Sequence, residues 1–205
     1  MNFINNINFL FKFLSYTSKE FSPCKIYQIL EFEKLKMKNK SIEFGTFNYE
    51  ESFTKFIRPK SDKNFFSNLK KIKKKNYFQL NLEKKNNLNK KFDNIIIFNV
   101  LEHVYEIDKA FKELKKLLKP KGKIYISTPF LYRYHSAPKD YYRFTLDFYE
   151  KIARKHKIKI IYKKSLGTGP FFGSYSVMHN ILNFVFPLNI LIATILIFFD
   201  KIINI

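Results

Sequence analysis

Two short segments of the chain gather side chains that can take up a proton or hold a charged group. The first is LEHV at 101–104, and the second is HSAPKDYYRFT, which begins at residue 135. A histidine titrates near neutral pH and can act as a general base. The histidine of the second segment is the better candidate because an acid, two tyrosines and an arginine follow it closely. We therefore predict a catalytic group made of His135, Asp140, Tyr141 and Arg143.

The same segments also admit structural interpretations, which the sequence leaves open. Asp140 and Arg143 can form an ion pair that holds the loop, an interpretation as well founded as contact with a substrate. His103 stands where a helix can begin, and we favour a hydrogen bond to the backbone there over a role as base. Glu102 is better suited to a helix start than to taking a proton.

Strand and helix patterns flank the LEHV segment. Residues 91–100 contain the apolar run IIIF at 95–98, which is typical of a strand buried on both faces of a parallel sheet. Residues 106–119 place apolar side chains on one helical face with lysines opposite. KPKG at 119–122 ends that helix, and residues 123–128 form the next strand. Strand, helix and strand at this spacing predict a right-handed crossover between parallel strands.

Further strands are expected on both sides of this unit. The candidates are residues 41–44, 64–69, 76–83 and 157–164, with a helix after Gly45 and another over 145–156. We therefore predict an α/β fold with a doubly wound, mostly parallel sheet. Such sheets bind ligands outside the carboxyl ends of their strands. The loops expected to form the site are those after Phe44, Asn68, Asn81, Asn99 and Thr128.

These loops carry a resemblance to a known family. FDNIIIFNVLEHV at 92–104 and ELKKLLKPKGKIYISTPF at 113–130 resemble the class I S-adenosylmethionine-dependent methyltransferases of the type 11 group. The family pattern is an F-D-hydrophobic strand, L-E-H-V, a helix ending in L-K-P-x-G and a strand ending in Pro. The HSAPKDYYRFT segment is similar to a subset with His-x-x-Pro-x-Asp-Tyr-x-Arg-Phe-Thr at this point. The resemblance implies a Rossmann-like fold.

The resemblance also implies that the chain binds S-adenosylmethionine. Glu43 and Gly45 match the acidic residue and the first glycine of the family's first turn, but Phe47 stands where a second glycine belongs. Asn68 takes the place of the acidic residue after the second strand, and Asn81 that of the Asp after the third. The expected cofactor set is completed after the fourth strand by Asn99, Glu102 and His103.

A methyltransferase of this kind makes modest demands on its protein. The methyl group on a sulfonium is already activated, so the protein mainly aligns the acceptor with it. The resemblance implies a small polar acceptor, and relatives with the second loop look like cell-surface polysaccharide enzymes. We therefore expect a small-molecule or glycan partner, such as a sugar or glycoconjugate precursor. The single cysteine excludes a Cys-rich zinc site, and we assign no metal ligand.

Two alternatives to this function remain. Departures at three cofactor positions allow a catalytically degenerate methyltransferase-like protein that binds a partner or docks on a membrane. The net charge of +21, from 38 basic against 17 acidic residues, allows a methyltransferase that binds nucleic acid. Only four of the basic residues are arginines, the residue suited to bidentate contacts with phosphates and bases. We therefore rank nucleic acid last.

The two ends of the chain differ from its middle. Apolar residues at helical spacing predict an amphipathic helix over 1–16, and they are Phe3, Ile4, Ile7, Leu10, Phe11 and Leu14. No Asp, Glu, Lys or Arg occurs from 165 to 199, and the apolar stretch 181–199 approaches the ~20 residues that span a bilayer. A spanning helix, an interfacial anchor and a buried or dimer-forming helix all stay open for that stretch.

The chain is therefore expected to have three parts. They are a helical N-terminal cap over 1–36, a methyltransferase-like α/β domain over 37–165 and an uncharged hydrophobic segment over 166–205. The lysine-rich body would attract an anionic membrane surface, so we favour some membrane contact. The expected location is cytoplasmic, with attachment or anchoring at the inner face of the membrane left open.

Overall fold

The computed structural model describes residues 3–17, 21–35, 37, 40–56, 63–167, 169–182 and 186–203. The chain divides into two compact units. The first, which we name the sheet unit, comprises Phe32–Phe130 and Tyr134–Lys164. The second, the helical unit, comprises Met1–Glu31, Leu131–Arg133 and Ser165–Ile205. All of the predicted site residues belong to the sheet unit.

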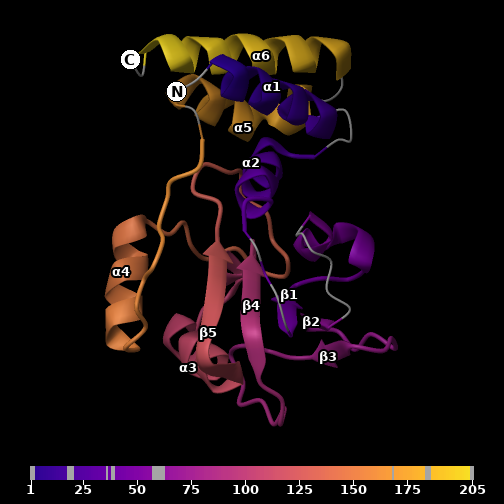
Figure 1. Ribbon diagram of the computed structural model, residues 1–205, viewed down its shortest axis with the longest axis vertical. Helices are drawn as coiled ribbons and strands as arrows, with labels where there is room; N and C mark the ends of the chain where they lie inside the picture. Colours follow the sequence, from indigo (N-terminus) through magenta and orange to yellow (C-terminus); the bar gives the residue numbers. More distant parts are fainter. Residues whose placement is uncertain are drawn as a thin grey trace. The chain divides into compact units, whose positions relative to one another are not determined.

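Within the described residues, five strands form one sheet in the order β3-β2-β1-β4-β5 (Figure 1). They are β1 (Ser41–Phe44), β2 (Asn64–Asn68), β3 (Tyr77–Gln79), β4 (Phe92–Phe98) and β5 (Leu118–Ser127). Every neighbouring pair is parallel, so the carboxyl ends of the strands share one edge. This strand order is that of doubly wound dinucleotide-binding sheets. The predicted α/β fold with a mostly parallel sheet is confirmed.

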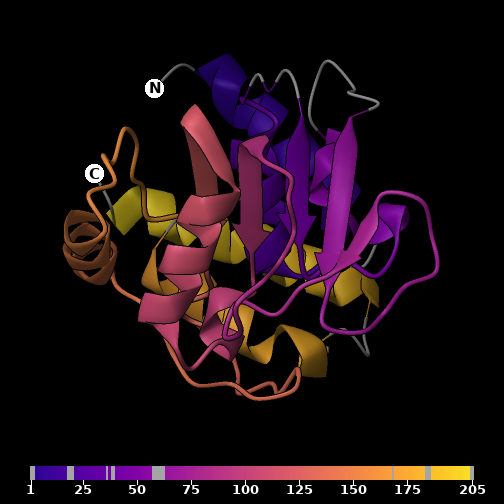
Figure 2. The same ribbon diagram turned by 90° about the horizontal axis from the view of Figure 1, so that it is seen from below.

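The apolar run predicted as a buried strand is an inner strand of the sheet. β4 pairs with β1 on one side and β5 on the other, and Ile95, Ile96 and Ile97 are completely buried. The predicted helix is α3 (Ile107–Leu117), which lies against β5 (Figure 2). Its buried apolar face is Ile107, Ala110, Phe111, Leu114 and Leu117. The helix predicted over 145–156 is α4 (Leu146–Lys155), which begins after the capping hydroxyl of Thr145.

The strand predicted over 157–164 does not form. Ile160, Ile161 and Tyr162 are exposed, so these apolar side chains cover no sheet face. Lys163 forms an ion pair with Glu150 of α4 instead. None of the described strands pairs with this segment, and an alternation of Lys and Ile does not specify a strand without a neighbour to bond with.

The chain after Gly45 also differs from the prediction. In place of a continuous helix it forms two short 3₁₀ helices, η1 (Tyr49–Glu51) and η2 (Phe53–Phe56). Ser52 lies between them with an extended backbone (φ −68°, ψ 138°). Short polar side chains that bind nearby groups compete with helix formation, which accounts for the interruption. β5 differs as well, because it begins at Leu118 and so includes the KPKG segment predicted to end the helix.

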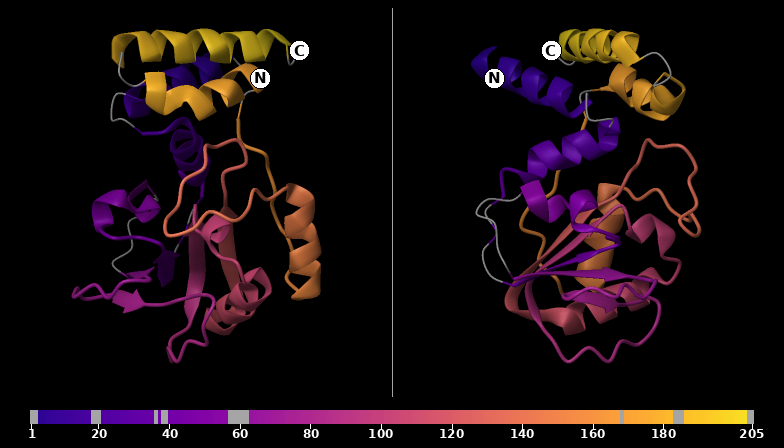
Figure 3. Two further views of the ribbon diagram at one scale, coloured as in Figure 1. Left: turned by 180° about the vertical axis from the view of Figure 1, so that it is seen from behind. Right: turned by 90° about the vertical axis from the view of Figure 1, so that its right-hand side faces the viewer.

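The helical unit contains α1 (Phe3–Thr17), α5 (Pro170–Leu182), α6 (Phe186–Ile203) and all but the last residue of α2 (Pro23–Phe32). α5 and α6 lie side by side (Figure 3). The core of the unit consists of Phe13, Ile26, Phe172, Tyr175, Ala193 and Ile197. The buried carboxylate of Asp200 accepts hydrogen bonds from the N–H groups of Phe171 and Phe172, each at 2.9 Å. These bonds tie the last turn of α6 to the start of α5.

The structure tests part of what was predicted for the two ends of the chain. A helix forms at the N-terminus, but its predicted apolar stripe is wrong at Phe11, which is 70% exposed, whereas Phe13 is 1% exposed. The difference arises because α1 turns the face of Phe13 and Thr17 inward. Four residues of the predicted stripe have side chains outside the described set: Phe3, Ile4, Ile7 and Leu10. Among the described residues, no helix has both the length and the apolar character needed to cross a membrane.

Candidate functional site

The residues predicted to bind a ligand lie at the carboxyl edge of the sheet. Asn68 ends β2, and Asn99 directly follows β4. The N–H of Gly45 donates to the carbonyl of Ser67, and the N–H of Asn99 donates to that of Ser127, both at 2.9 Å. The ends of β1 and β2, and those of β4 and β5, are therefore joined by backbone hydrogen bonds.

The turn after β1 requires its glycine. Gly45 has φ +82°, a backbone conformation that residues with a side chain rarely adopt. A Cβ added there would lie 2.7 Å from Cγ2 of Val100, in the loop after β4. The turn therefore keeps bare backbone next to the β4 loop. Phe47, at the position of the family's second glycine, is 52% exposed, so its ring does not fill the sheet interior.

Glu43 holds the loop that follows this turn. The residue is buried, and its Oε1 accepts from the N–H of Phe53 at 3.0 Å. Its Oε2 accepts from the Ser52 hydroxyl at 2.5 Å and from the N–H of Thr54 at 3.3 Å. Burial raises the pKa of Glu43, and these hydrogen bonds oppose that rise. Both carboxylate oxygens are thus engaged by the protein itself.

The two asparagines predicted after β2 and β3 each close a local turn. Oδ1 of Asn68 accepts from the N–H of Lys70 at 3.0 Å, and Oδ1 of Asn81 accepts from the N–H of Glu83 at 2.8 Å. Near them lies an open hollow of about 590 Å³. Its apolar lining is Leu69, Phe78, Leu80 and Leu88, and its polar lining includes Asn81, Asn86 and Asn87.

Glu102, unlike Glu43, has a carboxylate that accepts no hydrogen bond from the described residues. It lies in the short helix η3 (Leu101–His103), where its side chain is completely buried. Neither of its carboxylate oxygens has a hydrogen-bond partner in the described part of the chain. Burial raises the pKa of Glu102 to about 8. Its backbone carbonyl accepts from the N–H groups of Tyr141, at 2.8 Å, and Tyr142, at 3.3 Å. The residue therefore anchors the segment 135–145, which we name the 135–145 loop.

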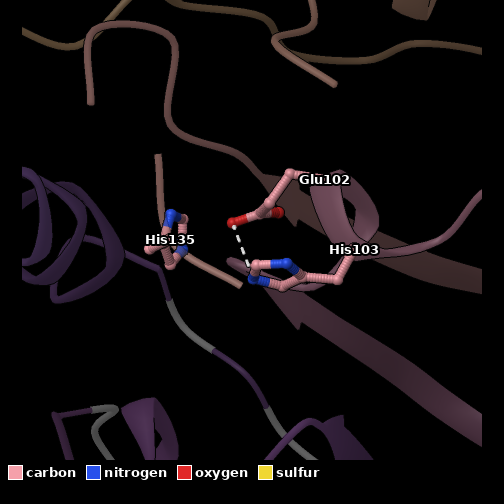
Figure 4. Close-up of side chains that lie close together, drawn as sticks. All are labelled: Glu102, His103 and His135. Atoms are coloured by element: carbon pink, nitrogen blue, oxygen red, sulfur yellow. Dashed lines mark ion pairs between the residues drawn. The ribbon is translucent and has the colours of Figure 1, made fainter. Parts of the chain in front are cut away.

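Two histidines lie beside this carboxylate (Figure 4). Nδ1 of His103 is 2.6 Å from the carbonyl oxygen of Lys139, so it carries the proton and donates. Nε2 of His103 is 3.9 Å from Oε1 of Glu102. The ring of His135 meets that of His103 edge-on, with the centroids 4.8 Å apart. Burial lowers the pKa of His103. His103 does bond to the backbone, but at the distant carbonyl of Lys139 and not at a helix start, because it is the last residue of η3.

Asp140 and Arg143 hold the 135–145 loop together. Nη1 and Nη2 of Arg143 donate to the two oxygens of Asp140 at 2.5 and 2.7 Å. Asp140 also accepts from the N–H of His135 at 2.9 Å, and only 2% of its side chain is exposed. The guanidinium holds the pKa of Asp140 well below its usual range. This is the ion pair that the sequence allowed, and it fixes the backbone that carries His135.

Tyrosines border the same loop. The ring of Tyr141 is 5.3 Å from that of Tyr105, and both are exposed. The hydroxyl of Tyr142 donates to the carbonyl of Tyr105 at 3.1 Å. Tyr105 was not among the predicted site residues. Its position, immediately after LEHV, was the only signal in the sequence that could have pointed to it.

The structure regroups the predicted residues. Glu102 and His103, predicted as cofactor-binding, converge with His135, predicted as catalytic. Glu43, Asn68 and Asn81 bond within their own loops. The sequence placed the LEHV and 135–145 segments after neighbouring strands, which was a signal for their proximity. It contained no signal that the Glu102 carboxylate would be left without a partner.

A comparison with protein families agrees with this architecture. A family model described as a methyltransferase domain matches residues 16–157, which is more than half of the chain. The chain therefore belongs to this family, within the class I S-adenosylmethionine-dependent methyltransferases. Neither the curated proteins nor the solved structures contain a significant match.

Proposed function

We propose that this protein transfers a methyl group from S-adenosylmethionine to an oxygen or nitrogen of a small polar acceptor, such as a sugar or glycoconjugate precursor. The observation that carries the proposal is the glycine turn at the carboxyl end of β1, in a sheet of the order β3-β2-β1-β4-β5. Ligands of such sheets bind where these strands end.

The residues present at this edge fit the cofactor. Gly45 leaves bare backbone where the cofactor's methionine part would pass. The hollow beside β2 and β3 is lined by apolar side chains, amides and the lysines Lys84 and Lys85. Its apolar and amide parts suit a flat, apolar ring with a polar rim such as adenine. Asn68 and Asn81 would face the ribose and adenine, each with fewer acceptor atoms than an acid provides. When bound, the group supplies a methyl carbon on a positively charged sulfur.

The chain's own residues would then orient the acceptor and manage its proton. The Asp140–Arg143 pair holds the 135–145 loop, which presents His135 beside Glu102 and His103. The imidazole of His135 would take the proton of an acceptor hydroxyl that reaches this group. The exposed rings of Tyr105 and Tyr141 offer apolar faces with polar edges at the rim of the same site. Such rings suit a polar acceptor with an apolar face.

Calorimetric titration of S-adenosylmethionine into the full chain tests the cofactor part of the proposal. We expect micromolar binding, and Gly45→Ala should weaken it at least tenfold because the new Cβ meets Val100. Gly167→Ala is the matched control, since Gly167 also has a positive φ but has nothing within 4 Å of an added Cβ. A folded protein that shows no binding up to about a millimolar contradicts the proposal and favours the catalytically degenerate alternative.

Methyl transfer from labelled cofactor to a panel of nucleotide sugars and glycans tests the acceptor part. Transfer to one of these compounds is the expected result. A protein that binds the cofactor but methylates none of them would contradict the acceptor class and leave the cofactor assignment standing.

A second proposal concerns the helical unit, for which we propose docking on an anionic membrane surface. α6 exposes Leu191, Ile195, Phe198 and Ile202, which lie along one side of the helix. The net charge of +21 favours a surface of anionic lipid, which would place the protein at the inner face of a membrane. Co-sedimentation with phosphatidylglycerol vesicles should exceed that with phosphatidylcholine vesicles and should fall for Phe198→Asp. Equal sedimentation of the wild-type protein and Phe198→Asp contradicts the proposal.

A further inference from the structure

Three side chains that can bind a metal ion meet where η3 contacts the 135–145 loop. Glu102, His103 and His135 each offer one ligand atom there, and these atoms all lie within 4.8 Å of one another (Figure 4). We propose that these three side chains form a binding site for a divalent transition-metal ion such as Zn²⁺ or Mn²⁺. Two imidazoles and one carboxylate make up the ligand set of open metal sites with positions left for a substrate.

Within the described part of the chain, the buried carboxylate of Glu102 lacks the hydrogen bonds that a buried acid needs. A buried polar group without a hydrogen bond is rare in folded proteins and calls for a partner. Both oxygens of this carboxylate are buried and lack a partner among the described residues. The nearby Arg143 does not supply one, because its guanidinium donates to Asp140. A bound cation would neutralise the charge and satisfy the oxygens together.

The surroundings of the two histidines supply an independent argument. Histidines that bind a metal usually donate their other ring nitrogen to a carbonyl or carboxylate, which fixes the ring and its tautomer. Nδ1 of His103 donates to the carbonyl of Lys139 at 2.6 Å. Nδ1 of His135 is 3.3 Å from Oδ2 of Asp140. Each histidine therefore has an outer partner on Nδ1, which makes Nε2 the ligand atom in both.

The spacing of the three groups is compatible with closure on one ion. Metal–ligand bonds of roughly 2.0–2.2 Å place neighbouring ligand atoms about 3 Å apart. Nε2 of His103 and Oε1 of Glu102 are 3.9 Å apart. A shift of about an ångström is within the reach of side-chain rotation. The side chain of His135, which is 27% exposed, has room for such a rotation.

The choice of ion follows from the ligands. The imidazole nitrogens suit Zn²⁺ and Fe²⁺ and the carboxylate suits Mn²⁺, whereas Ca²⁺ prefers a full set of oxygen ligands. With an ion bound, His135 is a ligand and no longer the base of the proposed methyl transfer. The cation would instead lower the pKa of an acceptor hydroxyl that reaches it, so that the hydroxyl proton passes to water. This catalytic consequence rests on the proposed function, whereas metal binding itself does not.

Calorimetric titration of ZnCl₂ into chelator-treated, dialysed full chain tests the site. We expect one ion per chain, and we expect His135→Ala and Glu102→Gln each to weaken binding at least tenfold. His156→Gln is the matched control, because His156 is a buried histidine paired with Asp108 and lies outside the cluster. Circular dichroism of each variant confirms that it is folded. Absence of binding to the folded wild-type chain, or equal binding by all variants, overturns the proposal.

Two further measurements separate the inference from the proposed function. Co²⁺ bound by two imidazoles and a carboxylate absorbs visible light, and we expect this absorption to disappear in His103→Gln; an unchanged spectrum overturns the assignment. S-adenosylmethionine is then titrated in the presence of a chelator. Cofactor binding by a protein that binds no Zn²⁺ overturns the metal site alone, whereas Zn²⁺ binding by a protein that binds no cofactor overturns the proposed function alone.

Discussion

Two buried glutamates lie at the same edge of the sheet and differ in what surrounds them. Glu43, at the end of β1, accepts hydrogen bonds from Ser52, Phe53 and Thr54. Glu102, after β4, has no hydrogen-bond partner for its carboxylate among the described residues. Burial of an acid therefore does not by itself indicate a function. A carboxylate whose bonds are complete holds a loop, and one whose bonds are missing is open to a ligand.

Replacement by glutamine should lower the free energy of unfolding at Glu43 and raise it at Glu102. Glu43→Gln replaces one acceptor oxygen with an NH₂ group that faces N–H donors, so a buried donor loses its partner. We expect the free energy of unfolding to fall by about 3 kcal/mol, measured by urea denaturation at pH 7. An unchanged midpoint would show that Glu43 does not hold the loop.

Glu102→Gln should have the opposite effect on the metal-depleted protein. Its folded-state pKa of about 8 lies above the ordinary 4.5, so wild-type stability falls as the pH rises from 4.5 through 8. Glutamine carries no charge and avoids this loss. We expect the variant to be more stable than wild type by on the order of 2 kcal/mol at pH 8.5 and nearly equal to it at pH 4.5. A variant less stable than wild type at both pH values would contradict the comparison.

Asp140→Asn tests the pair that holds His135 in place. The substitution removes a charge-assisted, two-pronged contact with Arg143 and should lower the free energy of unfolding by about 1.5 kcal/mol at pH 7. The pKa of Asp140 is lowered in the folded protein, so its stabilising effect is present above the ordinary pKa and is lost as the pH falls. The difference between variant and wild type should therefore shrink below about pH 3, as urea denaturation across pH would show.

Asn68→Asp should strengthen the cofactor side of the edge. The carboxylate keeps an acceptor for the N–H of Lys70 and adds a second acceptor with a full charge for the ribose hydroxyls. We expect the affinity for S-adenosylmethionine to rise about tenfold, measured by calorimetry. Lys70→Ala serves as the control because it leaves the backbone N–H in place, and equal gains in both variants would contradict a role for Asn68.

The fold could be predicted where the local sequence shows which side chains are buried. The apolar run of β4 is uninterrupted because both faces of that strand are covered. α3 has a single apolar face because only one side of the helix is buried. The segment 157–164 mixes Lys with Ile and Tyr but has no described strand beside it, and pairing depends on distant parts of the chain. Phe11 and Phe13 could not be told apart, because either phenylalanine can face inward at helical spacing.

The site was predictable in position and not in chemistry. Strand order places Asn68, Asn99 and the LEHV segment at one edge, and the sequence located all three. The grouping of Glu102 with His135 depends on the path of the 135–145 loop, which the Asp140–Arg143 pair and the carbonyl of Glu102 determine. Contacts between residues so far apart in the chain leave no local pattern, so the sequence did not bring Glu102 and His135 together.

The backbone contacts of Glu102, together with the metal binding proposed for its side chain, have a consequence for how this family can diversify. Its carbonyl holds Tyr141 and Tyr142, and a carbonyl is present whatever the side chain. Evolution can therefore exchange the residue at position 102 without releasing the 135–145 loop. Homologues that carry another residue there should keep the shape of the loop and differ in the reaction it serves, so this one position allows new activities to arise on an unchanged scaffold.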